Sequence, residues 1–467
     1  MSRILLAALL ALAGAAATAK EPTDVLFFFD AEDFVSNRSH DAIRDLANIL
    51  ADEGVRGNFA LSGYLAKKLV DRRRFDVLDA LKGHLVGSQT LYHSVHPNLT
   101  ESTDLADFDA AYRHAQREEA EAAGMIRAAT GQDRLWCSVF PGNGTSYVGL
   151  YLHADFGIPF FGGCSPVYAN DGRSRGHLWY CNQWHLPYHG AFSLENFLLR
   201  RVASEEEIAS GLDRAAKLEA VVFAMHPCMA VKSEFWDAVN FRGGNLHPWG
   251  EWVEAADRDP AETAAFYARL RALIRRLKAD GRFRLTDCER LYATKKPRAK
   301  ITRREIPAIR AALGREFRNI VEPASWSVAD CFQAAVRLLR GEREYRPGTV
   351  HGFLEKPVGV TTRTTVRRED LIAASRGMDL GGFLPASIRV GGVRIGPADF
   401  LFAALETLET GADEVTVRPR EQLGDIAKDL PGLVEFRQNA NWIYWPAFRD
   451  DYLSDRLRLQ FWTLRYE

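Results

Sequence analysis

The chain has 467 residues, of which 47% are hydrophobic and 26% are charged, and its formal net charge is −1. The length favours two domains, and the composition is that of a globular protein with a sizeable core, which argues against disorder. The balanced charge gives no support to a nucleic-acid partner or to binding at an anionic membrane surface.

The N-terminal residues combine a basic tip with a short apolar stretch, followed by the small-residue site Ala17-Thr-Ala19 before Lys20. This pattern is typical of a secretory signal peptide over residues 1–19. The alternative is an N-terminal anchor helix, for which the apolar stretch is short. No other segment is long and apolar enough to span a membrane. We therefore expect a secreted or periplasmic protein with no membrane span after removal of the signal.

The six cysteines are scattered and form no Cys-x-x-Cys pair, which argues against a structural zinc knuckle. They are Cys137, Cys164, Cys181, Cys228, Cys288 and Cys331. An exported chain can pair some of them, but we expect most to be small buried hydrophobic residues.

Strand-like and helix-like segments alternate from residue 20 to residue 294. The expected strands are 25–29, 55–60, 84–87, 135–139, 158–161 and 218–225. The expected helices are 39–52, 74–82, 104–130 and 261–279. Such alternation predicts parallel strands joined by crossover helices, in an open sheet or a closed barrel.

The character of the chain changes after a basic run at residues 295–304, which we interpret as a linker. Residues 305–467 are expected to form an accessory domain with a weak internal repeat. Residues 327–341 resemble residues 396–408, and each copy carries Ala-Asp at the start of an amphipathic helix. The C-terminal end is rich in aromatic residues, which would stack on sugar rings if exposed; we expect them to be core.

Polar groups follow three of the apolar strands. They are Asp30, Glu32 and Asp33 after strand 25–29, His93 and His96 after strand 84–87, and His226 after strand 218–225. The C-terminal ends of parallel strands share one face, where catalytic groups of α/β proteins lie. Carboxylates and imidazoles together at such a face indicate an enzyme with a metal site. The alternative is that each group is satisfied by local hydrogen bonds.

These motifs resemble those of the polysaccharide deacetylase superfamily (the NodB-homology carbohydrate esterases), in a branch of exported bacterial members. The similarity covers residues 23–293. Asp30-Ala-Glu-Asp33 resembles the family's first motif, Gln89-Thr-Leu-Tyr-His-Ser94 its second, and Phe223-Ala-Met-His226 its last. The resemblance implies an α/β fold, a distorted (β/α)7 barrel over residues 20–294, followed here by the smaller, mostly helical accessory domain.

The resemblance also implies roles for the polar residues. Asp30 is the general base and His226 the general acid. Asp33, or alternatively Glu32, binds the metal together with His93. Gln89 stands where the family has its first histidine, and its amide oxygen is a weaker ligand than imidazole. His96 is the alternative third ligand.

The implied reaction is metal-assisted hydrolysis of an N- or O-linked acetyl group on a carbohydrate or polysaccharide. The metal is a divalent ion, zinc in the first place, although an oxygen-rich ligand set leaves its identity open. Candidate substrate-binding residues are Trp236, Asp237 and Tyr147. Trp236 and Asp237 either line the groove or hold their loop against the barrel. Tyr147 closes the segment 139–147, which resembles a family motif without its arginine.

Two other functions stay open at this stage. The first is a carbohydrate-binding protein that has lost its complete metal site, which Gln89 favours. The second is an unrelated glycosidase on the same scaffold. A glycosidase needs two carboxyl groups about 5–10 Å apart across a sugar cleft, and the sequence offers no clear second one.

Overall fold

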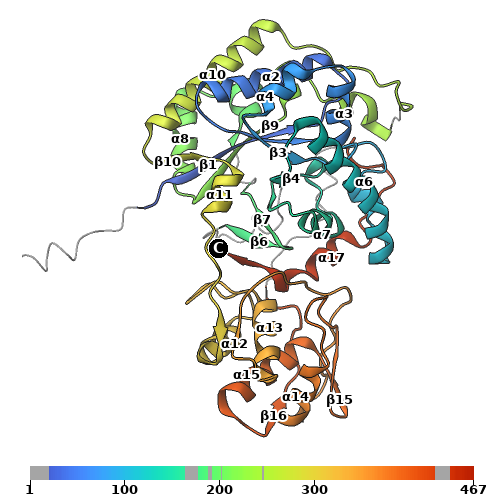
Figure 1. Ribbon diagram of the computed structural model, residues 1–467, viewed down its shortest axis with the longest axis vertical. Helices are drawn as coiled ribbons and strands as arrows, with labels where there is room; N and C mark the ends of the chain where they lie inside the picture. The colour runs from blue at the N-terminus through green and yellow to red at the C-terminus, as the bar shows by residue number, and fades with distance from the viewer. Residues whose placement is uncertain are drawn as a thin grey trace, which may run out of the picture.

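The chain folds into a larger α/β part and a smaller part that follow one another along the long axis of the molecule (Figure 1). The computed structural model describes residues 20–163, 177–187, 192–200, 202–244, 247–425 and 442–466. The expected signal peptide and Cys164 lie outside these residues.

The larger part is built on one curled sheet whose centre is parallel. Its strands run in the order β17-β6-β7-β5-β4-β3-β2-β1-β9-β8, and β10 also pairs with β1. The parallel strands are β1 (Thr23–Ala31), β2 (Asn58–Leu61), β3 (Leu85–Ser88), β4 (Cys137–Ser138), β5 (Phe160–Phe161), β7 (Gln183–His185), β8 (Phe192–Ser193), β9 (Ala220–Met225) and β10 (Phe283–Thr286). This arrangement confirms the predicted distorted barrel.

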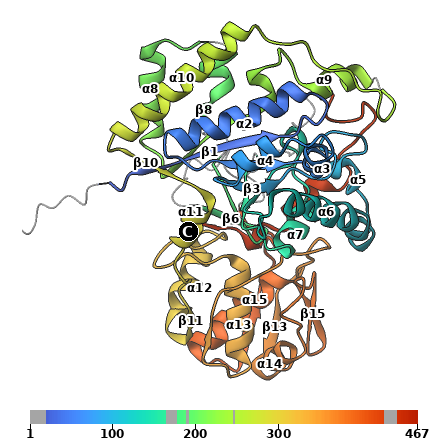
Figure 2. The same ribbon diagram turned by 45° about the horizontal axis from the view of Figure 1, so that its top comes forward.

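Helices cover the outer face of this sheet. They are α2 (Asn37–Asp52), α3 (Gly63–Asp71), α4 (Phe75–Leu81), α6 (Phe108–Thr130), α7 (Tyr147–Asp155), α8 (Glu205–Ala215) and α10 (Pro260–Ala279). The short helix α11 (Cys288–Ala293) packs instead on the interior core of the sheet. Figure 2 shows α2, α8 and α10 on the same side of β1. The elements expected from the periodicity between residues 20 and 294 are present, with ends displaced by a few residues.

The two faces of the sheet have separate cores because side chains alternate along a strand. Val25, Phe27 and Phe29 of β1 pack under the helices. Leu26 and Phe28 point the other way, into the interior of the curled sheet. All five side chains are fully buried, which explains why this strand reads as one continuous apolar run.

One glycine permits the close approach of two strands in this interior. A Cβ atom built on Gly87 of β3 would lie 2.3 Å from the carbonyl oxygen of Cys137 in β4. Any side chain there would push β4 away, so this glycine keeps the strand ends close together.

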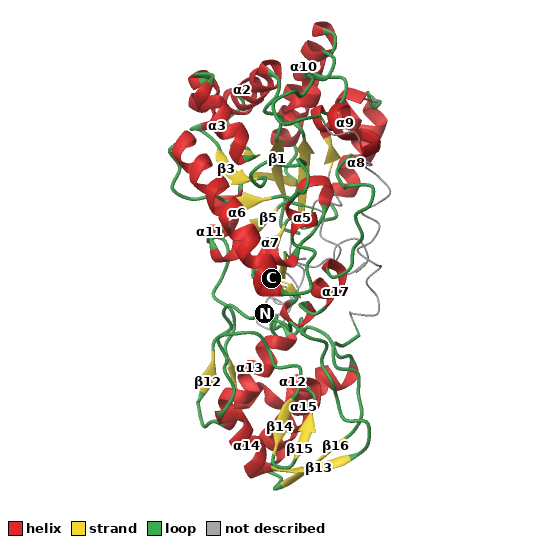
Figure 3. Cartoon of the chain, turned by 90° about the vertical axis from the view of Figure 1, so that its right-hand side faces the viewer, coloured by secondary structure: helices red, strands yellow, loops and turns green. Residues whose placement is uncertain are grey.

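The smaller part has its own apolar core, formed mainly by four helices. They are α12 (Ile306–Arg315), α13 (Val328–Leu339), α14 (Arg368–Arg376) and α15 (Pro397–Thr410). Three two-stranded antiparallel sheets flank them: β11 (Ile301–Thr302) with β12 (Glu344–Tyr345), β13 (Thr364–Arg367) with β16 (Glu414–Val417), and β14 (Ile388–Val390) with β15 (Val393–Ile395). Figure 3 shows these short strands at the far end of the molecule from the main sheet.

The two similar sequences in this part begin their helices in the same way. Asp330 accepts a hydrogen bond from the backbone N–H of Ser327 at 3.0 Å, and Asp399 accepts one from the backbone N–H of Gly396 at 2.9 Å. In each helix the aspartate therefore binds the residue three positions before it.

The end of the chain returns to the larger part. The last described strand, β17 (Arg465–Tyr466), pairs antiparallel with β6 (Leu178–Tyr180) of the main sheet. Four of the eight C-terminal aromatic residues are core, since Tyr444, Phe461, Trp462 and Tyr466 are at most 8% exposed, whereas Trp445 and Tyr452 are exposed. The division at residues 295–304 stays a prediction, and residues 442–466 contact both parts.

Two further expectations concern the membrane and the cysteines. Among the described residues, no helix has the length and apolarity needed to cross a membrane. Cys137, Cys181, Cys228, Cys288 and Cys331 are buried free thiols, which agrees with their interpretation as small core residues.

Candidate active site

Asp30 and His226 reach the same place because each continues the inward face of its strand. In β1, Asp30 follows Phe28 with the period of two that keeps a side chain on one face. In β9, His226 follows Ala224 in the same way, and both Phe28 and Ala224 belong to the interior core. The strands are parallel neighbours with Phe29 opposite Met225, so both polar groups emerge at the C-terminal edge.

The imidazole of His226 lies between two carboxylates. Its Nε2 atom is 3.6 Å from Oδ2 of Asp30, and its Nδ1 atom is 2.6 Å from Oε1 of Glu195. The backbone N–H of His226 donates to the same Glu195 oxygen at 2.7 Å. The side chain of His226 is 27% exposed, whereas those of Asp30 and Glu195 are nearly buried.

Glu195 is a candidate site residue that the sequence analysis missed. It begins the single π-turn segment Glu195–Arg200, directly after β8. A carboxylate following an apolar strand is the same signal that identified Asp30, but β8 has only two residues and gives almost no pattern. Glu195 lies beside His226 because β8 pairs with β9.

The carboxylates around His226 favour its cationic form. Burial alone disfavours the charge, but the charges of Glu195 and Glu32, the Glu195 hydrogen bond and the charge of Asp30 outweigh it and raise the pKa of His226 to about 10. At neutral pH the side chain is therefore an imidazolium held in place at Nδ1.

His93 belongs to a second, neutral chain of hydrogen bonds. Its Nδ1 atom lies 3.0 Å from Oγ of Ser94, and that hydroxyl donates to Oδ2 of Asp237 at 2.7 Å. Burial, together with the charge of His226, lowers the pKa of His93 to about 3. Since the Ser94 hydroxyl proton goes to Asp237, its oxygen accepts the Nδ1 proton of His93.

The two remaining carboxylates of the first motif have different surroundings. Oδ1 of Asp33 accepts the backbone N–H groups of Val35 and Ser36, and Oδ2 accepts the hydroxyl of Ser39. Asp33 therefore organises the start of α2, and both its oxygens already have partners. The metal-binding role of Asp33 stays a prediction.

Glu32 is buried in the site with little hydrogen bonding. Its Oε1 receives the Cys228 thiol at 3.6 Å, and Oε2 has no hydrogen-bond partner among the described residues. Burial raises the pKa of Glu32 well above its usual range, His226 opposes this, and Asp30 adds to it. Glu32 is thus near the Asp30–His226 pair but favours its neutral form.

Gln89 and His96 differ in their hydrogen bonding. Gln89 is 2% exposed and continues the inward face of β3 after Gly87, and its Oε1 has no partner within the described residues. His96 is used elsewhere: Nδ1 pairs with Glu101 at 2.8 Å, and Nε2 lies 3.1 Å from the carbonyl oxygen of Trp442. In this structure both ring nitrogens of His96 have partners, one in Glu101 and the other in the C-terminal segment, so His96 does not take the place of the missing ligand.

The predicted substrate-binding residues are buried and do not line an open groove. Trp236 is 1% exposed and packs on Phe34 at 4.6 Å between ring centroids. Asp237 is 2% exposed and accepts hydrogen bonds from Ser94 and from the backbone N–H of Ala238. Both hold their loop against the barrel, which was the alternative interpretation.

Tyr147 is also a core residue. It lies at the start of α7, is 2% exposed and packs between Phe108 and Phe383. Its assignment to the substrate site stays a prediction that this packing does not support.

The donors present do not fit the metal site that the family resemblance implies. Across the described ranges, no group of three or more His, Cys, Asp or Glu side chains is arranged to hold a metal ion. The physical reason lies in the partners already described: Asp33 caps a helix and His96 binds the C-terminal segment. His93, Glu32 and Gln89 remain as donors, and in the described ranges His93 and Glu32 belong to no group of three such side chains.

Comparisons with known proteins gave matches to solved structures only. No family model and no curated protein matches the chain. A 4-alpha-glucanotransferase from Thermococcus litoralis is similar over 60% of this chain, with 11% identity and a TM-score of 0.41. The chain spans 41% of the length of that protein.

Other matched structures belong to carbohydrate esterase family 4. The enzyme from Streptomyces lividans, solved with acetate, is matched over 56% of this chain and 90% of its own, at 15% identity and a TM-score of 0.30. A pseudoenzyme of that family from Bacillus anthracis is matched over 44% of this chain and 56% of its own, at 16% identity and a TM-score of 0.28. The inference on function therefore rests on the side chains of this chain.

Proposed function

We propose that this protein is an exported hydrolase that removes acetyl groups from a carbohydrate. The observation that carries the proposal is the contact chain Asp30–His226–Glu195 at the C-terminal edge of a parallel sheet. One carboxylate and one imidazolium side by side supply the base and the acid that hydrolysis of an ester or amide requires. The assignment of a carbohydrate as the substrate rests on the motif resemblance over residues 23–293.

The chemistry follows from which atoms already have partners. Oδ2 of Asp30 accepts a proton from water as the water oxygen attacks the acetyl carbonyl carbon. The bond from that carbon to the sugar oxygen or nitrogen then breaks. Nε2 of His226 donates its proton to the leaving atom, since Nδ1 is held by Glu195. Acetate and the free hydroxyl or amine are released.

No step of this proposal passes through a metal ion. The resemblance implies one, but Asp33 and His96 have other partners. The cationic His226 is a positive charge beside Asp30, with Nε2 3.6 Å from Oδ2 of Asp30. Such a charge stabilises a developing oxyanion when water is excluded.

A second candidate function is non-catalytic carbohydrate binding. It is favoured by Gln89, which replaces a ligand histidine of the family and leaves a buried amide oxygen without a partner among the described residues. A glycosidase is less well supported, because Asp30 and Glu195 contact opposite nitrogens of one imidazole. The two carboxyl groups of a glycosidase must instead face a common sugar.

An acetate-release screen on acetylated glycans separates these functions. The full chain lacking residues 1–19 should release acetate from at least one O- or N-acetylated glycan, and Asp30→Asn should abolish release while keeping the melting temperature. Glycan binding without acetate release from any substrate would favour the binding protein. Export is tested separately, by the mass of the protein secreted from a bacterial host: cleavage after Ala19 is expected.

A further inference from the structure

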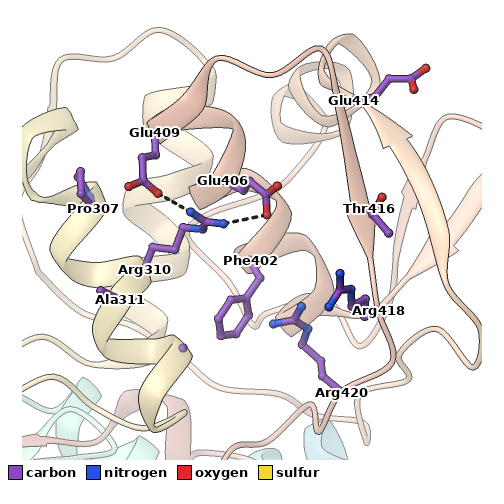
Figure 4. Close-up of a pocket in the computed structure, with 11 residues that line it drawn as sticks. Pro307, Arg310, Ala311, Phe402, Glu406, Glu409, Glu414, Thr416, Arg418 and Arg420 are labelled. Carbon is purple, nitrogen blue, oxygen red and sulfur yellow. Dashed lines mark hydrogen bonds and ion pairs between the residues drawn. The ribbon is translucent and has the colours of Figure 1, made fainter.

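The smaller part of the chain contains a pocket that is remote from Asp30 and His226. It lies between α12, α15 and the residues that continue β16, and its volume is about 700 Å3. This volume falls within the range of about 300–1,000 Å3 usual for small-molecule sites. Figure 4 shows the charged side chains that surround it.

One end of the pocket carries one arginine paired with two glutamates. Arg310 of α12 forms ion pairs with Glu406 at 3.0 Å and with Glu409 at 2.7 Å, both from α15. These bonds join the two helices and leave carboxylate oxygens facing the pocket beside the guanidinium (Figure 4). The carboxylate oxygens at this end can accept hydrogen bonds from hydroxyl groups of a ligand.

The opposite end carries two arginines close together. Arg418 and Arg420 are two residues apart in extended chain after β16, so their side chains share one face, and Figure 4 shows them next to each other. Arg418 is exposed and makes no ion pair within the described ranges. Two adjacent like charges repel each other unless an anion lies between them.

Arg420 is held in place but incompletely satisfied. Its guanidinium stacks over Phe402 at 3.9 Å from the ring centroid, and its Nε lies 3.7 Å from Oδ1 of Asp399. That Nε–H is buried and has no hydrogen-bond partner in the described part of the chain. Asp399 also accepts hydrogen bonds from Gly396, Val360 and Gln422, so it does not neutralise two arginines.

We infer that this pocket binds a sugar acid, a uronic-acid residue of a glycan, with its carboxylate between Arg418 and Arg420. Two guanidinium groups match the planar, bidentate geometry of a carboxylate. The hydroxyl groups of the sugar then donate to Glu406, Glu409 and Thr416. Glu414 also lines the pocket, and the three glutamates would repel a ligand with many charges, such as a polyphosphate. This site is independent of the proposed hydrolase activity.

The test is calorimetric titration of the full chain with a galacturonic acid trimer and with its neutral methyl ester. We expect the acid to bind at least tenfold more tightly than the ester. Arg418→Ala should weaken binding of the acid roughly tenfold, the effect of losing about one charge-assisted hydrogen bond. Arg389→Ala, an exposed arginine of β14 outside the pocket, is the matched control and should bind normally.

Three results would overturn the inference. They are equal binding of the acid and the ester, unchanged binding in Arg418→Ala, and displacement of the trimer by equimolar inorganic phosphate, which would indicate a simple anion site. Asp30→Asn should bind the trimer like the wild type. Trimer binding can therefore be measured whether or not the proposed hydrolase activity is found. Because Arg418 is exposed, an unchanged melting temperature is expected for its variant.

Discussion

The Nδ1 atom of His226 lies 2.6 Å from Oε1 of Glu195, and the backbone N–H of His226 donates to that same oxygen. One carboxylate oxygen therefore fixes both the position of the imidazole and the ring nitrogen that carries its bound proton. The other nitrogen, Nε2, faces Asp30. This relationship determines which atom can serve as the acid.

Glu195→Gln should reduce turnover and change its dependence on pH. Removing the carboxylate charge lowers the pKa of His226, so the alkaline limb of the pH profile should move down from its position near 10. We expect kcat to fall by about 10²-fold or more, the range for general acid catalysis. Glu206→Gln, an exposed change on α8, is the control. A fall in kcat with an unmoved alkaline limb would mean that Glu195 is only structural.

The charge of His226 should also make stability depend on pH. Its pKa is raised from an ordinary value near 6.5 to about 10 in the folded chain. A raised pKa contributes stability that is fully present below about pH 6.5 and is lost as the pH rises through about 10. Urea unfolding of the wild type and of His226→Gln between pH 6 and 10 measures this. The difference in unfolding free energy between the two proteins should shrink as the pH rises. A constant difference would mean that His226 is not a cation in the folded chain.

Asp33→Ala should destabilise the fold without changing metal content. The substitution leaves the N–H groups of Val35 and Ser36 without their acceptor at the start of α2, which costs about 1–3 kcal/mol. Denaturant unfolding gives the free energy, and elemental analysis gives the metal per chain. If zinc content falls while stability is kept, Asp33 is a ligand after all.

Removal of divalent metal should leave the protein as it was. Because Asp33 and His96 already have partners, purified protein should carry well below one zinc ion per chain. Treatment with a chelator should then change neither acetate release nor the melting temperature, whereas a bound metal would stabilise the folded state by mass action. Activity that disappears with the chelator and returns with zinc would show that the site assembles on binding.

The two parts of the molecule are joined by a buried ion pair. Arg465 of β17 contacts Asp330 of α13 at 2.8 Å, and both side chains are fully buried. Asp330→Ala leaves the guanidinium without its counter-charge and should lower the unfolding free energy by about 3–5 kcal/mol. Asp79→Ala, which removes an exposed pair with Lys82, is the control and should have little effect. Equal effects of the two variants would mean that the pair does not join the parts.

Much of the larger part follows from local patterns. The apolar runs at residues 25–29 and 218–225 predicted β1 and β9, and the polar residues that follow them do lie at one edge of the sheet. The roles of Asp30 and His226 stay predictions that the screen above tests. The assignments of Asp33, His96, Trp236 and Tyr147 also stay predictions, and each of these side chains takes hydrogen bonds or packing that motif spacing does not reveal.

The sequence by itself determined the main strands, their parallel pairing and the delivery of Asp30 and His226 to one edge, because apolar runs and the alternation of strands and helices are local properties of the chain. Only the tertiary structure decided which partner each polar group takes. Glu195 reaches His226 through the pairing of β8 with β9, and the carbonyl of Trp442 reaches His96 from 346 residues away. Such contacts depend on atoms distant in the chain. They place His226 between Asp30 and Glu195, and they give Asp33 hydrogen bonds at the start of α2.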